Sequence, residues 1–223
     1  MNMADTNAVT IPILPFEYAS PAMSMDELQH EIIACGCPLH IDKINWIDYP
    51  YAPEVTAYLA HDGRQLFCVF TVNERHLRIK ALDDNGPVWE DSCVEIFIAD
   101  ADGTHYYNFE TNAGGTALAS LRVSRTDCEH FTSQKMKRIM RHSSRPRHEA
   151  SINNPDGIGW TLLVGIPFDL IGYDSTPAEL RINLYKCGDK TDTPHFLSWA
   201  PISTPAPDFH RPEFFVPVKL RQL

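Results

Sequence analysis

The chain has 223 residues, of which 43% are hydrophobic and 22% charged, proportions typical of a folded globular protein rather than a disordered or fibrous one. Its 29 acidic and 19 basic residues give a net charge of -10, so its own field opposes binding to nucleic acid or anionic membranes, and neither is expected as a partner. Proline, at 17 residues, outnumbers glycine at 11, which disfavours long helices.

No apolar run approaches the roughly 20 residues of a membrane-spanning helix, so none is expected. Residues 1–10 show no positive charge followed by an apolar stretch, so no secretory signal is visible. Two locations are therefore expected as alternatives: the cytoplasm by default, or outside the cell if a leader has been removed. The six cysteines form no Cys-x-x-Cys pair, and those at 68, 93 and 187 lie in apolar runs, which predicts buried thiols.

The first 25 residues contain three prolines among short apolar pieces and predict an extended arm, with residues 9–14 placed along a sheet edge. A short helix is predicted over Asp26 to Ala34, because Ser24 is a suitable N-cap and apolar residues follow at helical spacing. The arm (1–25) is therefore expected to precede one domain (26–223).

Beyond this helix, short apolar runs alternate with Gly, Pro, Asp and Asn about every ten residues, a pattern typical of an antiparallel sandwich. The fold class is therefore predicted to be all-β, an immunoglobulin-like or jelly-roll antiparallel β-sandwich with one or two short helices. The predicted strands are Val55–Ala60, Gln65–Asn73, Cys93–Ala99, His105–Thr111, Ala117–Val123, Glu149–Ile152, Trp160–Ile166, Leu180–Cys187 and Phe214–Leu220.

The connections carry their own signals. Three Asp-Gly pairs, at 62–63, 102–103 and 156–157, fall between predicted strands and are expected to close hairpins. The basic stretch Lys135 to His148 is interpreted as a solvated strand or loop in preference to an anion site. The proline-rich tail Pro194 to Pro217 is expected to form an ordered irregular loop before the last strand.

Alternation along the strands sorts side chains by face and reveals a polar one. Glu95 lies between Cys93 and Phe97 on one face of its strand, opposite to Val94, Ile96 and Ile98. If the strands share a sheet, a surface of hydrogen-bonding groups results, made by Glu95, Asn108, Glu110, Arg181 and Asn183. Such a surface suits a polyhydroxylated ligand, although an antiparallel sheet can also simply present one face to solvent.

Two tryptophans are placed on connections. Trp89 precedes the Cys93 strand and Trp199 lies in the tail, whereas Trp160 alternates with apolar residues and is assigned to the core. An indole beside a polar face suits sugars, because the C–H groups of a pyranose ring pack on the indole while its hydroxyls form hydrogen bonds.

These segments resemble the carbohydrate-binding modules of family 9, of the stand-alone bacterial type. The spacing from Trp89 to Glu95 is the strongest part of the similarity, which is carried by Val88–Ile98 (VWEDSCVEIFI), Leu180–Asp189 (LRINLYKCGD), His195–Pro201 (HFLSWAP) and Pro207–Phe215 (PDFHRPEFF). The resemblance implies a β-sandwich that binds a mono- or oligosaccharide without catalysis, with Trp89 and Trp199 as an aromatic clamp and Glu95 bonding sugar hydroxyls. The oligomeric state is left open.

Three alternatives remain at this stage. Glu95 and Glu110 could serve as the carboxyl pair of a glycoside hydrolase. A haem-binding sandwich is the second alternative, because related sandwiches bind haem through Met and His and one segment here contains Met136, Met140 and His142. No cofactor is otherwise expected, although Asp100–Gly103 carries hard oxygen ligands for a structural calcium ion, with a plain turn favoured there.

Overall fold

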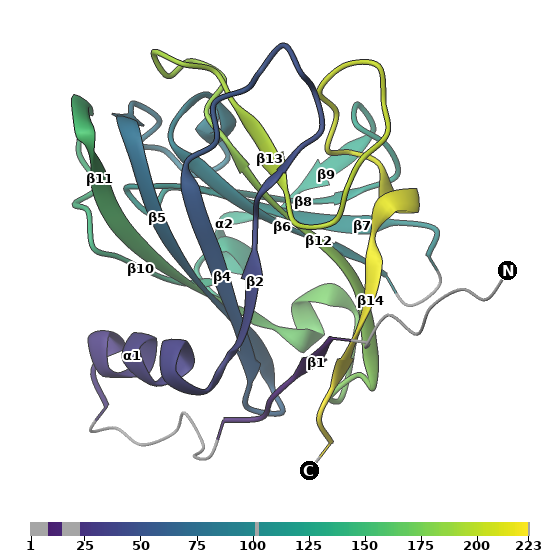
Figure 1. The fold of residues 1–223 in the computed structure, drawn as a ribbon. Coiled ribbons are helices and arrows are strands. Elements are labelled where there is room, and N and C mark those ends of the chain that lie inside the picture. Colours follow the sequence, from purple (N-terminus) through teal and green to yellow (C-terminus); the bar gives the residue numbers. More distant parts are fainter. Residues whose placement is uncertain (1–8, 15–22, 101–102, 223) are drawn as a thin grey trace, which may run out of the picture.

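The structure, a computed structural model, describes residues 9–14, 23–100 and 103–222, and two mainly antiparallel sheets dominate it (Figure 1). The larger sheet has nine strands in the order β1-β14-β12-β6-β7-β8-β9, with β13 paired to β12 and β3 paired to β13. Their bounds are β1 Thr10–Ile11, β3 Lys43–Ile44, β6 Cys93–Ala99, β7 Tyr106–Asn112, β8 Ala117–Arg122, β9 Cys128–His130, β12 Glu179–Cys187, β13 Phe196–Ser198 and β14 Val216–Leu220.

The smaller sheet has five strands in the order β10-β11-β5-β4-β2. Its strands are β2 Cys37–His40, β4 Glu54–His61, β5 Gln65–Ile79, β10 Met140–Ser143 and β11 Ala150–Pro167. Helices are few and short: α1 Met25–Cys35, α2 Ser133–Met136 and the 3-10 turns η1 Val88–Glu90, η2 Phe168–Ile171 and η3 Pro212–Phe214. The predicted all-β sandwich with one or two short helices is confirmed.

The main core lies between the two sheets, where the predicted alternation places it. Val94, Ile96 and Ile98 of β6 are buried there together with Ile182 and Leu184 of β12. Because successive side chains of a strand point to opposite faces, the residues between them are turned to the outer face of the larger sheet. No helix in the described part of the chain is long and apolar enough to span a membrane.

The N-terminal predictions agree with the structure where it describes them. Ser24 caps α1: its Oγ accepts the Glu27 N–H at 3.2 Å, and the Glu27 carboxylate accepts the Ser24 N–H at 2.7 Å. The helix packs over the outer face of the smaller sheet through Leu28 and Ile32. Of the predicted arm, β1 pairs in parallel with β14, while residues 1–8 and 15–22 lie outside the described residues.

One turn prediction is wrong. The two strands predicted at 149–152 and 160–166 belong to the single strand β11, which pairs with β5 on both sides of an irregularity between Asn153 and Ile158. Asp156-Gly157 lies in this bulge and closes no hairpin. Gly157 has a φ of 99°, and an added Cβ would collide with the amide of Asn73. The glycine therefore lets β11 continue past the bulge beside β5.

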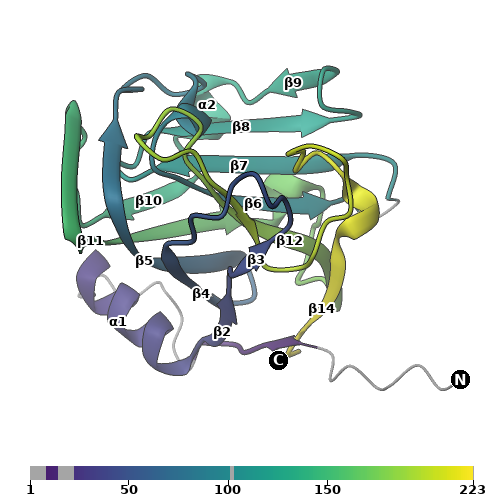
Figure 2. The same cartoon turned by 45° about the horizontal axis from the view of Figure 1, so that its top comes forward.

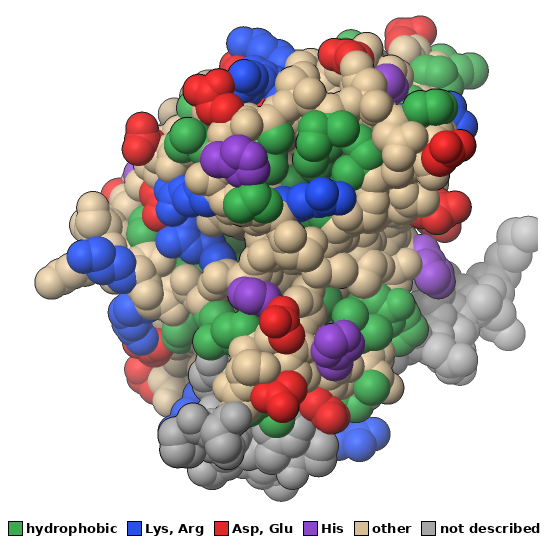
Figure 3. Space-filling view, turned by 90° about the vertical axis from the view of Figure 1, so that its left-hand side faces the viewer, with side chains coloured by type: hydrophobic (Ala, Val, Ile, Leu, Met, Phe, Trp, Pro, Cys, Tyr) green, Lys and Arg blue, Asp and Glu red, His purple; other side chains and the backbone are tan. Residues whose placement is uncertain are grey.

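The basic stretch 135–148 forms the end of α2 and strand β10, and three of its four arginines are paired with acids, while Arg145 donates to the carbonyl of Gly159. Arg138 contacts Asp169 at 2.7 Å, and Arg141 and Arg147 share Asp84 at 2.7 and 3.1 Å. Figure 3 shows basic and acidic side chains interspersed on the side of the molecule that carries β11 and α1. This charge pairing gives no support to an anion site there.

A second apolar cluster lies on the outer face of the larger sheet, beneath the tail. Tyr185 of β12 stacks on Phe209 of the tail with ring centroids 4.2 Å apart, and Phe97 and Phe215 join the same cluster. The tail, drawn in yellow, passes over β6 and β12 in Figure 2. The predicted irregular loop therefore covers the outer face of the larger sheet. Most of the polar face predicted from alternation is buried beneath it.

Candidate functional site

A cavity of about 450 Å³ opens on the outer face of the larger sheet, between the tail and η1. Its walls include four aromatic rings, and its floor is polar. The aromatic side chains are Tyr49, Trp89, Phe196 and Phe209; the polar ones on or near the floor are Glu95, Glu110, Arg122, Cys187 and Asp189; Arg125, Pro207, Asp208 and His210 complete the lining. The volume lies in the range of small-molecule sites.

Two carboxyl groups define the floor. Glu95 of β6 is the direct register partner of Glu110 of β7, and each side chain is 3% exposed. Burial raises the pKa of Glu95 well above its usual value, and the charge of Glu110 raises it further. Burial also raises the pKa of Glu110, to about 7, against the lowering effect of the Arg122 charge. Near neutral pH Glu95 therefore keeps its proton and Glu110 is protonated in part, so the pair can donate as well as accept hydrogen bonds.

A chain of hydrogen bonds holds Glu110 in place. Arg122 Nε donates to Asn108 Oδ1 at 2.7 Å, and Asn108 Nδ2 donates to Glu110 Oε1 at 2.7 Å. Arg122 Nη1 also donates to the carbonyl of Arg125 at 2.7 Å. Asn108, one of the predicted ligand-binding residues, is fully buried and lies behind the cavity, where it positions Glu110.

Glu95 has a different neighbourhood. Its Oε1 accepts the thiol of Cys187 at 3.1 Å, and no arginine hydrogen bond to it is present among the described residues. Cys187 stands opposite Cys93 in the pairing of β12 with β6, so two thiols lie on the same outer face as Glu95. The prediction of buried thiols at 68, 93 and 187 is confirmed, and none of the three forms a disulfide.

Trp89 lies at the rim of the cavity. The indole sits on the short turn η1 and is 38% exposed. Its carbonyl accepts the backbone N–H of Asp189 at 3.2 Å, which ties η1 to the end of β12. Other segments of the chain supply the remaining rings of the cavity. The rings of Tyr49 and Phe196 are in edge-to-face contact, with centroids 4.8 Å apart. An exposed aromatic face therefore borders a polar floor.

Of the two tryptophans of the predicted aromatic clamp, only Trp89 lines the cavity. Trp199 does not line the cavity; it packs, partly buried, against the core between the sheets. Ser198 pairs with Tyr185 and shares its outer face, so the next residue along the chain turns to the inner face. The cavity's further aromatic groups are Tyr49, Phe196 and Phe209.

Arg181 and Asn183 share the outer face with the carboxyls, as alternation predicts, yet neither lines the cavity. Asn183 is fully buried and binds the backbone of Ala200, accepting its N–H at 3.0 Å and donating to its carbonyl at 3.2 Å. Arg181 Nη2 donates to the carbonyl of Phe215 at 2.7 Å. Both predicted ligand-binding residues therefore anchor the tail that covers the sheet.

The groups considered for haem do not come together. Met136 is buried between the sheets, Met140 packs beside the cluster under α1, and His142 pairs with Asp26 at 2.7 Å. For calcium, Ala101 and Asp102 lie outside the described residues, while the Asp100 carboxylate accepts the His105 N–H at 3.2 Å. The calcium site stays a prediction.

Sequence reasoning did not select several lining residues. Asp189 and the tail residues Asp208, Phe209 and His210 lie inside segments that carry the resemblance, but no strand alternation marks them as part of a site. Tyr49 comes from a connection far from those segments, and no sequence pattern marked it as a site residue. Burial raises the pKa of Asp189 to about 6 and lowers that of His210 to about 3.

Comparisons with known proteins identify the family of the chain. The sequence profile described as carbohydrate-binding family 9 matches residues 27–220. A crystal structure of a protein from Bacteroides uniformis, described as a candidate carbohydrate-binding protein, is 31% identical with a TM-score of 0.86, over 96% of this chain and 100% of that one.

Two structures of a family 9 carbohydrate-binding module from Caldicellulosiruptor kristjanssonii share the fold at 12% identity. The complex with cellotriose has a TM-score of 0.57, over 96% of this chain and 93% of that one. The complex with glucose has a TM-score of 0.52, over 95% of each chain. No curated protein matches this chain.

Proposed function

This chain belongs to carbohydrate-binding family 9, and we propose that it holds a sugar ring, without catalysis, in the cavity between Trp89 and the carboxyls of Glu95 and Glu110. The observation that carries the proposal is an exposed indole at the rim of a cavity whose floor consists of buried hydrogen-bonding groups. A sugar ring has the matching surfaces, C–H groups on its face and hydroxyls on its edge.

The carboxyl pair suits neutral hydroxyl groups. A protonated carboxyl of Glu110 donates one hydrogen bond and accepts another, while Asn108 and Arg122 hold it in orientation. Because Glu95 and Glu110 face each other across two hydrogen-bonded strands, their positions are set by the sheet and not by a loop. Preorganised groups lose little freedom when a ligand binds, which favours selective recognition.

Binding is expected to be weak. A monosaccharide has about a dozen heavy atoms, and roughly 0.3 to 0.5 kcal/mol per atom corresponds to a dissociation constant between ~1 mM and ~50 μM. Glucose and cellotriose are the first ligands to test, because they are the sugars in the two structural neighbours. The measurement is a calorimetric or NMR titration of the purified chain. Saturable binding in this range supports the proposal, and flat titrations across a broad glycan panel contradict it.

The absence of catalysis is part of the proposal. Glycoside hydrolysis uses one fully ionised carboxyl and one protonated carboxyl, whereas burial keeps Glu95 protonated and leaves Glu110, with a pKa of about 7, ionised only in part near neutral pH. The neighbouring groups of Glu95, a thiol and a second carboxyl, do not hold it ionised. Incubation with aryl glycosides should release no phenol above background. Release that disappears in Glu95→Gln would identify an enzyme instead.

A further inference from the structure

We propose that Cys93, Glu95 and Cys187 form a binding site for a thiophilic divalent cation such as Zn²⁺, with an open coordination position that faces the cavity. The inference goes beyond sugar binding and does not depend on it. It rests on the placement of three ligating side chains on one rigid face of the larger sheet.

The geometry of the three groups matches what a small cation requires. The two Sγ atoms and a carboxylate oxygen of Glu95 all lie within 4.8 Å of one another, and Cys187 Sγ is 3.1 Å from Glu95 Oε1. Zinc binds thiolate sulfur at about 2.3 Å and carboxylate oxygen at about 2.0 to 2.2 Å in a tetrahedral arrangement, which places neighbouring ligands roughly 3.5 Å apart. Small side-chain rotations therefore suffice.

Strand pairing fixes this placement. Cys93 and Glu95 are two residues apart on β6 and therefore project from the same face, and Cys187 is the direct register partner of Cys93 on β12. All three side chains are buried, at 3% exposure or less. The ligands thus come from the middle of a sheet, where their backbone positions are well determined, although no Cys-x-x-Cys pair exists in the sequence.

The donor set selects the kind of metal. Two thiolates favour zinc and other soft or borderline cations, whereas calcium and magnesium favour sites built entirely from oxygen. Three protein ligands leave one tetrahedral position free, the arrangement of zinc sites that bind water or a ligand. Because Cys187 and Glu95 both line the cavity, that position faces the space proposed for the sugar.

Metal binding at this site is coupled to the release of protons. Glu110 and Asp189 are carboxyl groups close enough to raise the pKa of Glu95, and Arg122 is the cation whose charge lowers it. Burial raises the pKa of both thiols, that of Cys93 to about 12, so without a metal these groups are protonated. Binding forms two metal–sulfur bonds and one metal–oxygen bond, and the two thiol protons and the Glu95 proton leave to solvent.

The test uses the full chain, stripped of metal by a chelator and kept reduced by a phosphine, and titrated with Co²⁺ as a spectroscopic probe for Zn²⁺. The expected result is a sulfur-to-cobalt charge-transfer band that saturates at one Co²⁺ per chain and is lost on adding Zn²⁺. No band in the reduced wild-type chain would overturn the proposal. So would a Cys93–Cys187 disulfide that persists under the reductant.

Variants locate the site. Cys93→Ala and Cys187→Ala should each lose the band, and Glu95→Gln should weaken Co²⁺ binding. The matched control is Cys68→Ala, which removes a fully buried thiol from β5 in the other sheet and should keep the band. A band that survives in both Cys93→Ala and Cys187→Ala would assign the metal to other thiols and overturn the proposal. If these variants do not fold, the wild-type titration still decides.

The same samples separate this inference from the proposed function. Metal binding is read from cobalt absorption with no sugar present, and sugar binding from calorimetry on chelated protein. Loss of one therefore leaves the other measurable.

Discussion

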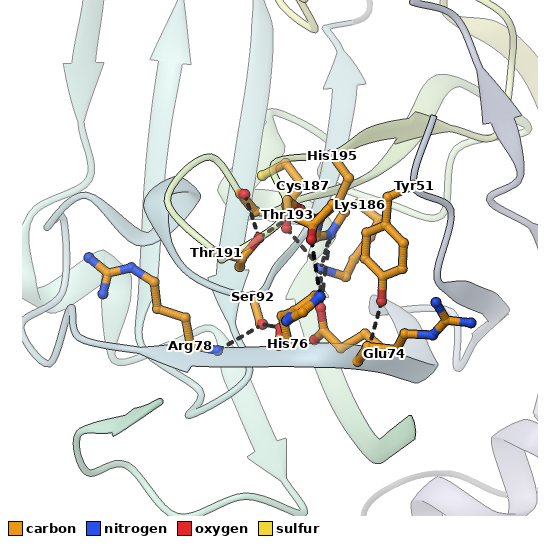
Figure 4. A network of polar contacts seen from close by, with 12 residues as sticks. Tyr51, Glu74, His76, Arg78, Ser92, Lys186, Cys187, Thr191, Thr193 and His195 are labelled. Atoms are coloured by element: carbon orange, nitrogen blue, oxygen red, sulfur yellow. Dashed lines mark hydrogen bonds and ion pairs between the residues drawn. The ribbon is translucent and has the colours of Figure 1, made fainter. Parts of the chain in front are cut away.

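Lys186 Nζ, on β12 of the larger sheet, lies 3.0 Å from Glu74 Oε2, on β5 of the smaller sheet, and both side chains are fully inaccessible to solvent. The pair joins the two sheets inside the core. Trp160 Nε1 donates to the other carboxylate oxygen at 2.6 Å, and His195 Nε2 lies 2.9 Å from Lys186 Nζ. Figure 4 shows Glu74, Lys186 and His195 pointing toward one another from different elements.

Removal of one partner of this pair should be costly. Lys186→Met leaves the Glu74 carboxylate buried without its cation, so we expect the free energy of unfolding in urea to fall by about 3–5 kcal/mol. The double variant Lys186→Met, Glu74→Gln should recover part of that loss, because no isolated charge remains. Lys80→Ala, which breaks the exposed pair with Glu149, is the control and should cost at most about 1 kcal/mol. Equal losses for both lysines would contradict a special role for the buried pair.

The carboxyl pair on the cavity floor predicts a pH dependence of stability. The pKa of Glu110 is raised by burial from 4.5 to about 7, so between these values the folded chain binds more protons than the unfolded chain. Stability contributed by this group is therefore present below about pH 4.5 and is lost as pH rises through 7. Glu110→Gln should remove this loss, so its free energy of unfolding relative to the wild type should rise by about 3 kcal/mol from pH 4.5 to 8.

The control for this pH effect is Glu149→Gln. Glu149 is exposed, and its hydrogen bond with Lys80 lowers its pKa. Its contribution is therefore lost only as pH falls, and the stability of Glu149→Gln relative to the wild type should stay constant from pH 6 to 8. Parallel stability profiles for Glu110→Gln and the wild type from pH 6 to 8 would show that ionisation of the Glu110 carboxyl does not destabilise the folded chain.

The two tryptophans should respond differently to substitution. Trp89→Ala removes the exposed indole at the cavity rim, so sugar affinity should fall by at least about tenfold, or about 1.4 kcal/mol. Trp199→Phe keeps an aromatic ring in the inter-sheet core and should bind sugar as the wild type does, with at most a modest loss of stability. Titration of both variants with one sugar decides this. Loss of binding in Trp199→Phe alone would restore the clamp.

Asn183 predicts a stability effect of a different origin. Its side chain bonds both backbone groups of Ala200, but Ser198 Oγ also donates to that carbonyl at 2.6 Å, so Asn183→Ala leaves the buried N–H of Ala200 unpaired. We expect the free energy of unfolding to fall by about 1–3 kcal/mol, with hydrogen exchange faster in the tail. Arg181→Ala, which removes a single bond to the Phe215 carbonyl at a more exposed position, should cost about 1 kcal/mol or less. Faster tail exchange only in Arg181→Ala would contradict the assignment of Asn183 as the anchor.

The local sequence pattern was enough to predict strands and the face on which each of their side chains lies. β6 has the predicted bounds, and Glu95, Asn108 and Glu110 share one face because side chains alternate with a period of two. The cap at Ser24 was equally readable, since capping depends on residues only three positions apart. The bulge in β11 was missed, because an Asp-Gly pair favours a turn locally whether the flanking segments pair with each other or with a third strand.

Alternation along each strand was enough to predict which residues face outward from the larger sheet. Which of them reach the cavity depends on the folded tail: it covers Asn183, Arg181 contacts its end, and Glu95 and Glu110 are left at the floor. The tertiary structure also turned Trp199 inward, through the pairing of β13 with β12. The difference arises because the direction of a side chain in a strand is set by the adjacent peptide units. Whether another segment covers that side chain is set by packing between parts of the chain that are distant in sequence.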